Sequence, residues 1–123
     1  MATLAPTIVK VGEHCVKFTW GPITSANADG HPIAERYADY GDRSVHIKVT
    51  FGAATVHWDG SNDGVTYVPL ADPQGSAISK TAESIEQVLE ATLYQRPRAS
   101  AADGATSVTV IVFARRGRGG KEV

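Results

Sequence analysis

The chain has 123 residues, a net charge of −1 from 12 lysines and arginines against 13 aspartates and glutamates, and a hydrophobic fraction of 42%. This length fits one domain with one modest core, and the near-neutral charge points to neither nucleic acid nor a membrane as the partner. Residues 1–6 lack a basic stretch followed by an apolar run, and no segment approaches the roughly 18 apolar residues of a membrane span. We therefore expect no secretory signal and a protein made and kept, or assembled, in the cytosol.

The first forty residues predict one hairpin followed by a long loop. Residues 7–11 and 16–20 are short β-prone runs, and alternation in the second run places Val16, Phe18 and Trp20 on one face. Cys15, the one cysteine, lies in this apolar run and is expected to be a buried thiol. From 21 to 42 turn-forming residues dominate, which predicts a mobile loop or, in an assembly, a segment that reaches a neighbour.

The middle of the chain contains the clearest strand patterns. Residues 44–51 alternate strictly between apolar and polar side chains, as expected of a strand with one buried face. Residues 53–70 consist of two short apolar-alternating runs joined by Asp59-Gly-Ser-Asn-Asp-Gly64, which predicts a hairpin with a tight polar turn. A short strand is expected at 77–80.

The last forty residues predict an edge strand, a central strand and a tail. Residues 84–91 resemble a two-turn helix with a capping box, or alternatively a strand that passes over the sheet. Pro97 favours an edge position or a bulge for the strand at 93–98. Residues 107–113 are apolar on both faces, which favours a central or covered strand, and residues 114–123 are too rich in glycine and arginine to fold alone.

Seven or eight short strands with at most one short helix predict an all-β fold, an antiparallel β-sandwich or jelly roll. We expect a single domain over residues 1–123, with a long loop at 21–42 and a flexible basic tail at 114–123.

Three possible chemistries are weak in this sequence. Asp59, Ser61 and Asp63 alternate as calcium ligands do, but Leu70 stands where a calcium loop has its bidentate glutamate. His46 and His57 are expected on polar faces of neighbouring strands, without a third zinc ligand. No activated nucleophile or phosphate-binding glycine loop is present. We expect no enzymatic activity, no metal and no cofactor.

The turns and strands from residue 45 to 113 carry a family resemblance. The Gly60-Ser-Asn-Asp-Gly64 turn with its flanking aromatic residues, the Asp72-Pro-Gln-Gly75 turn, and the runs 85–90, 94–97 and 103–110 resemble small virion proteins of tailed bacteriophages. These include capsid cement, or decoration, proteins with a jelly-roll fold. The resemblance implies a structural protein on the outer surface of the capsid, assembled in the host cytoplasm. Its partners would be the major capsid protein and itself, as a homodimer or homotrimer, without membrane or specific nucleic acid.

An alternative resemblance is to discoidin and carbohydrate-binding sandwich modules, with Trp58, Tyr67 and His57 as a glycan platform, perhaps in a phage tail or fibre. The parity of the strand places Trp58 on the core face, which counts against this alternative.

Partner contacts are expected in the long loop and in the basic tail, because neither has a strand pattern. The loop contributes Asn27, Asp29, His31, Arg36, Tyr37 and Tyr40 as candidate partner-binding residues, and the tail contributes Arg115, Arg116 and Arg118. The tail arginines could grip phosphate only weakly, and docking on an acidic partner is the better interpretation.

Overall fold

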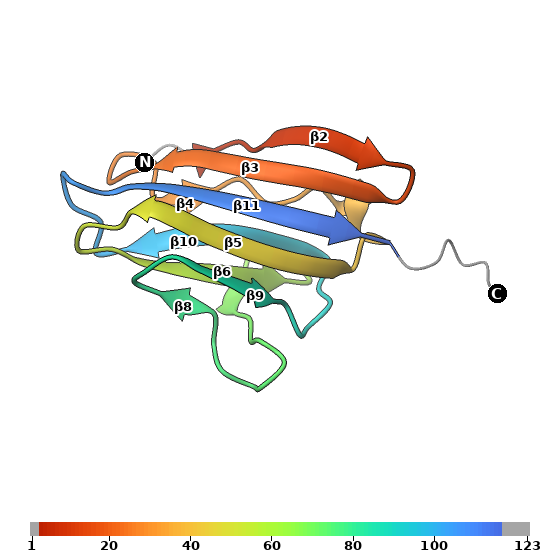
Figure 1. Ribbon diagram of the computed structural model, residues 1–123. Coiled ribbons are helices and arrows are strands. Elements are labelled where there is room, and N and C mark those ends of the chain that lie inside the picture. Colours follow the sequence, from red (N-terminus) through yellow and green to blue (C-terminus); the bar gives the residue numbers. More distant parts are fainter. Residues whose placement is uncertain (1–2, 117–123) are drawn as a thin grey trace.

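The computed structural model describes residues 3–116 and consists of two β-sheets packed face to face (Figure 1). In sheet A the strands are ordered β1 (Thr3–Leu4), β4 (Asp29–Gly30), β10 (Tyr94–Ser100), β6 (Thr55–Ser61) and β7 (Val68–Pro69), and β8 (Ser79–Lys80) also pairs with β6. In sheet B the order is β2 (Thr7–Gly12), β3 (Cys15–Ile23), β11 (Ser107–Arg115), β5 (Asp42–Thr50) and β9 (Ser84–Gln87). All pairs are antiparallel except β1 with β4. The predicted all-β sandwich is confirmed.

Strand β11 lies at the centre of sheet B, between β3 and β5, as its apolar sequence predicts. Val108, Val110 and Val112 are fully buried against the core, whereas Phe113 on the other face is exposed. An all-apolar strand is stable in this position because both of its backbone edges are paired and one of its faces is covered.

Two tryptophans join the sheets at the centre of the core. Trp20 of β3 and Trp58 of β6 pack edge to face with ring centroids 5.6 Å apart, and both are fully buried. Each indole N–H has an acceptor: Trp20 Nε1 donates to the carbonyl of His31, and Trp58 Nε1 donates to Oε1 of Gln95. The large apolar rings therefore enter the core without leaving a buried donor unpaired.

The hairpin predicted at 53–70 is present, but its turn lies at residues 62–67 rather than at 59–64. β6 runs through Ser61 and pairs with β7 through Asp59 opposite Pro69 and Gly60 opposite Val68. The turn itself is organised by Asp63, whose Oδ1 accepts hydrogen bonds from the backbone N–H groups of Val65 and Thr66.

Two expectations for the C-terminal half are corrected. The helical alternative for residues 84–91 is wrong, because Ser84–Gln87 forms β9 and pairs with β5. β10 is an internal strand despite Pro97, because β4 is only two residues long and its register with β10 is at Arg98. Gly30 of β4 passes so close to the Pro97 ring that a Cβ at this position would lie 2.5 Å from Cγ of the proline.

The segment 21–42 is more ordered than a long loop. It contains the end of β3, strand β4 and a 3₁₀ helix, η1 (Glu35–Tyr37), and it buries Ile23, Ile33 and Tyr40. Its aromatic and aliphatic side chains are spaced irregularly because they fill one open side of the sandwich rather than face a sheet at every second residue.

The first two residues of the tail predicted at 114–123 belong to β11, which ends at Arg115. Ala114 is fully buried, and Arg115 of β11 lies opposite Asp42 of β5, so both residues belong to the sandwich. Arg118 lies outside the described residues. Cys15 is half-buried at the start of β3 rather than inside the core, because Val16 takes the inward position.

Candidate functional site

A groove of about 490 Å³ lies at the end of the sandwich where β2, η1 and the end of β11 meet. One wall comes from the inward face of β2 and β3, and the other from η1 and the residues that follow it. We call it the basic groove; it is lined by Ile8, Lys10, Val16, Arg36, Tyr37, Asp39, Tyr40 and Arg116.

Aromatic packing holds the η1 wall against the core. Tyr37 packs edge to face on Phe18 with ring centroids 5.1 Å apart, and its other neighbour is Tyr40 at 5.9 Å. Because this segment forms no sheet, its buried carbonyl groups need hydrogen-bond donors from elsewhere in the protein.

The buried side chain of Arg43 supplies two of these donors. This side chain is 2% exposed, and its Nε and Nη2 donate to the carbonyls of Tyr40 and Tyr37 at 2.8 and 3.0 Å. Burial lowers the pKa of Arg43 to about 10, so the guanidinium remains charged at neutral pH. A buried charge that binds two backbone carbonyls positions the groove wall.

The groove carries a positive charge because three cationic side chains, Lys10, Arg36 and Arg116, face one carboxylate, Asp39. Arg36 lies over the ring of Tyr37 at 5.1 Å, and Arg116 lies over the ring of Tyr40 at 4.9 Å. Arg116 also contacts Asp39 at 3.4 Å and donates to the carbonyl of Glu13 at 3.0 Å. Stacking on aromatic rings orients both guanidinium groups without neutralising them.

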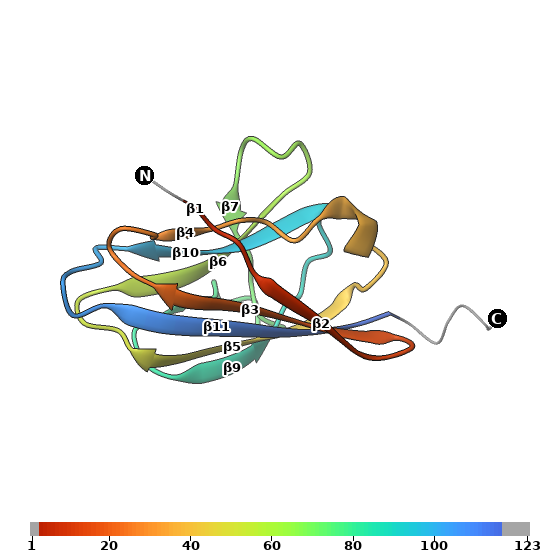
Figure 2. The same ribbon diagram turned by 90° about the horizontal axis from the view of Figure 1, so that it is seen from above.

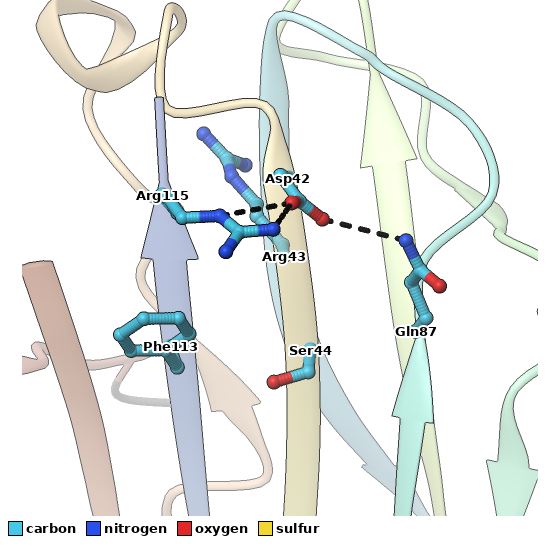
Figure 3. A pocket seen from close by; sticks show the side chains of 6 residues that line it. All are labelled: Asp42, Arg43, Ser44, Gln87, Phe113 and Arg115. Atoms are coloured by element: carbon cyan, nitrogen blue, oxygen red, sulfur yellow. Dashed lines mark hydrogen bonds and ion pairs between the residues drawn. The ribbon is translucent and has the colours of Figure 1, made fainter. Parts of the chain in front are cut away.

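A second, smaller hollow of about 290 Å³ lies beside the end of β11 and is lined by Asp42, Arg43, Ser44, Gln87, Phe113 and Arg115. Figure 3 shows Asp42 between Arg115 and Gln87, with the Phe113 ring beside them. Arg115 Nη2 donates to Oδ2 of Asp42 at 2.5 Å and Gln87 Nε2 donates to Oδ1 at 3.3 Å. Asp42 thus pairs with Arg115, and Arg43 is directed to the carbonyls of Tyr37 and Tyr40, so the hollow offers the Phe113 ring beside groups that already have partners.

The structure divides the sequence-predicted site residues that it describes into three groups. Arg36, Tyr37, Tyr40 and Arg116 come together in the basic groove, and Arg115 lies in the hollow. Three others line neither: Asn27, Asp29, which lies in β4 opposite Arg98, and His31, whose backbone carbonyl accepts from Trp20.

Four groove residues were missed from the sequence: Ile8 and Lys10 of β2, Val16 of β3, which was expected only in the core, and Asp39. The apolar residues on both faces of the run 7–11 were a signal, since a strand exposed on one side has little reason to carry them. The sequence could not indicate that β2 is an edge strand facing η1.

The side chains that the sequence offered as weak metal ligands make hydrogen bonds and ion pairs with other residues of the protein. Asp59 is 2% exposed and its Oδ2 accepts from Arg98 Nε at 2.6 Å, while Asp63 organises the turn. His46 and His57 are on different sheets, since β5 belongs to sheet B and β6 to sheet A; the expectation that they lie on neighbouring strands is wrong. His46 contacts Glu83, and His57 lies between the hydroxyls of Ser79 and Ser100. Within residues 3–116, no group of three or more His, Cys, Asp or Glu side chains could hold a metal ion.

The alternative glycan platform does not assemble as predicted. Trp58 is fully buried in the core, and the Tyr67 ring is covered by the Arg96 guanidinium at 4.0 Å. A sugar ring would need an open aromatic face, and Trp58 presents none, while one face of the Tyr67 ring is already occupied by Arg96.

Comparisons of the chain with protein-family models, with curated proteins and with solved structures find no match in any of the three. No helix within the described residues is long and apolar enough to cross a membrane.

Proposed function

We propose that this chain is a structural protein of a tailed-bacteriophage virion: a capsid cement protein that binds across neighbouring major capsid protein subunits on the outer surface of the head. The proposal draws on the resemblance of residues 45–113 to small virion proteins, and on the kind of surface that the fold presents. Assembly in the host cytoplasm and self-association as a dimer or trimer belong to the same proposal.

The observation that carries the proposal is the composition of the outer face of sheet B. Its register places Val9, Lys17 and Phe113 side by side, and places Ile85 next to His46 in the adjacent row. Val9, Ile85 and Phe113 are exposed by 44%, 62% and 41%. Exposed large apolar side chains beside a lysine on the face of a sheet are typical of a protein-binding surface.

Many copies of such a surface suit a cement function. Each copy contributes a modest interface, and simultaneous contact with two capsid subunits multiplies the effect because the second contact is intramolecular. A shell under internal DNA pressure gains resistance from every subunit pair that is tied together.

The test is co-sedimentation of the purified protein with mature capsids that lack it, followed by thermal challenge of the decorated and bare capsids. We expect saturable binding and a higher temperature of DNA release. Phe113→Asp should weaken binding, whereas Val65→Asp, at a residue 82% exposed in the turn after β6, should not. Bare capsids that resist heat as well as decorated ones would refute the proposal. Sedimentation equilibrium gives the oligomeric state.

A further inference from the structure

Strand β2 forms one edge of sheet B and is the longest edge strand among the described residues. β2 has six residues and pairs only with β3, whereas β1, β7 and β8 have two residues each and β9 has four. Figure 2 looks down on this edge, and no other described element lies over β2. An edge strand presents backbone N–H and C=O groups that can pair with a further strand.

The two faces of β2 differ in chemistry. Ile8 and Lys10 line the basic groove together with Arg36 and Arg116. Val9 lies on the opposite face, paired with Lys17, and Val11 follows at an irregularity in the pairing between Lys10 and Gly12; the two valines are 44% and 52% exposed. A strand added to β2 would therefore place every second side chain over the basic groove and the others beside the two valines.

Charge decides which partner fits this edge. A second copy of β2, with the sequence TIVKVG, would bring another lysine and no carboxylate to a groove that already holds three cations and one carboxylate. A segment with carboxylates at alternate positions would instead pair with Lys10, Arg36 and Arg116.

We propose that β2 and the basic groove bind an extended acidic segment of a partner protein by strand addition, with carboxylates over the groove and aliphatic side chains over Val9 and Val11. This inference rests on the proposed function in one respect: in a virion, the segment belongs to the capsid protein. About six residues of the partner suffice to cover Thr7–Gly12, since a strand rises about 3.3 Å per residue.

The test uses the full chain and a fluorescent eight-residue peptide that alternates valine and glutamate, with fluorescence anisotropy as the readout. Two control peptides are a block peptide of four valines and four glutamates, and an alternating valine–lysine peptide. We expect binding of the alternating acidic peptide alone, weakened by added salt because the groove charges are at the surface. Hydrogen exchange of the β2 amides should slow in the complex.

Charge reversals locate the site. Lys10→Glu and Arg36→Glu should each lower the affinity for the alternating acidic peptide by about fivefold or more, since each replaces an attraction by a repulsion. Lys48→Glu is the matched control, because Lys48 lies on β5, which β3 and β11 separate from β2, and it should leave the affinity unchanged.

Three results with the peptide would overturn the inference: equal binding of the block peptide, equal weakening of binding by the Lys48 control, or unchanged exchange of the β2 amides on binding. Self-association that is lost in Lys10→Glu would also overturn it, in favour of a second copy at this edge. If the wild type sediments with capsids and the Lys10 and Arg36 variants do so equally well, the inference fails and the proposed function stands. If the wild type does not sediment with capsids but binds the peptide at β2, the proposed function fails instead.

Discussion

Gln95 provides a sharp test of how the core is held together. Its side chain is 2% exposed, and it accepts from Trp58 Nε1 at 3.0 Å while donating to the carbonyl of Glu90 at 3.2 Å. In Gln95→Leu both of these partners lose their hydrogen bond inside the protein. The substitution keeps a side chain of similar length, so the main change is the loss of polar satisfaction rather than a cavity.

The expected cost follows from these two contacts. The Trp58 N–H, left unsatisfied in the core, costs about 1–3 kcal/mol, and the lost hydrogen bond to the part-buried Glu90 carbonyl adds about 0.5–1.5 kcal/mol. The additional apolar surface of leucine offsets about 1 kcal/mol. We therefore expect the free energy of unfolding to fall by about 0.5–3.5 kcal/mol, compared with the 5–15 kcal/mol typical of a domain.

The assay is equilibrium urea unfolding followed by tryptophan fluorescence and by circular dichroism. Gln87→Leu serves as the matched control, because Gln87 is exposed on β9 and its loss should change the free energy by less than about 0.5 kcal/mol. A double-mutant cycle adds a second criterion: Trp58→Phe should cost less in Gln95→Leu than in the wild type, since the hydrogen bond between the two side chains is then already lost and phenylalanine removes the unpaired N–H. A change below about 0.5 kcal/mol in Gln95→Leu, or purely additive effects, would refute the reasoning.

Three further outcomes are expected. Gly30→Ala should lower the free energy of unfolding by about 1–3 kcal/mol in urea titrations, because the new methyl group meets the Pro97 ring; an unchanged midpoint would contradict this packing. The backbone N–H groups of Val65 and Thr66, followed by the Ser61 hydroxyl, lower the pKa of Asp63. Asp63→Ala should therefore reduce the melting temperature at pH 7, and the difference from wild type should shrink as the pH falls below about 4; a difference independent of pH would argue against the carboxylate. Burial, and next the charge of Arg98, lower the pKa of His57, so the folded state binds fewer protons than the unfolded state. Wild-type stability should then fall as the pH drops below about 6.5, and His57→Gln, measured by thermal melts across this range, should flatten that dependence.

Local patterns were enough to predict the fold class and most strands. Residues 44–51 alternate because one face of β5 is buried, and the apolar run 107–113 lies centrally because a strand of that composition cannot remain exposed. These are consequences of side-chain period and burial, which act on a few neighbouring residues and can be recognised in any one of these segments.

The candidate site was predicted only in part. Arg36, Tyr37, Tyr40 and Arg116 were expected to contact a partner because they lie outside regular strand patterns, and the fold brings these four into one groove. Their convergence depends on the η1 wall and the end of β11, which are separated by about eighty residues, and on the contacts that Arg43 makes beneath them. The side-chain periodicity within one segment carries no information about contacts between segments so far apart in the sequence.

By itself, the sequence determined that the chain forms an antiparallel sandwich and that its unpatterned arginines and tyrosines are candidates for contact. Only the tertiary structure decided which strands are edges, since strand order follows from pairing between distant segments. It placed β5 and β6 on different sheets, which separated His46 from His57, and left β2 at an edge beside the cationic side chains. The physical reason is that burial and period act locally, whereas an edge, a groove and its charge arise only when remote segments are brought together.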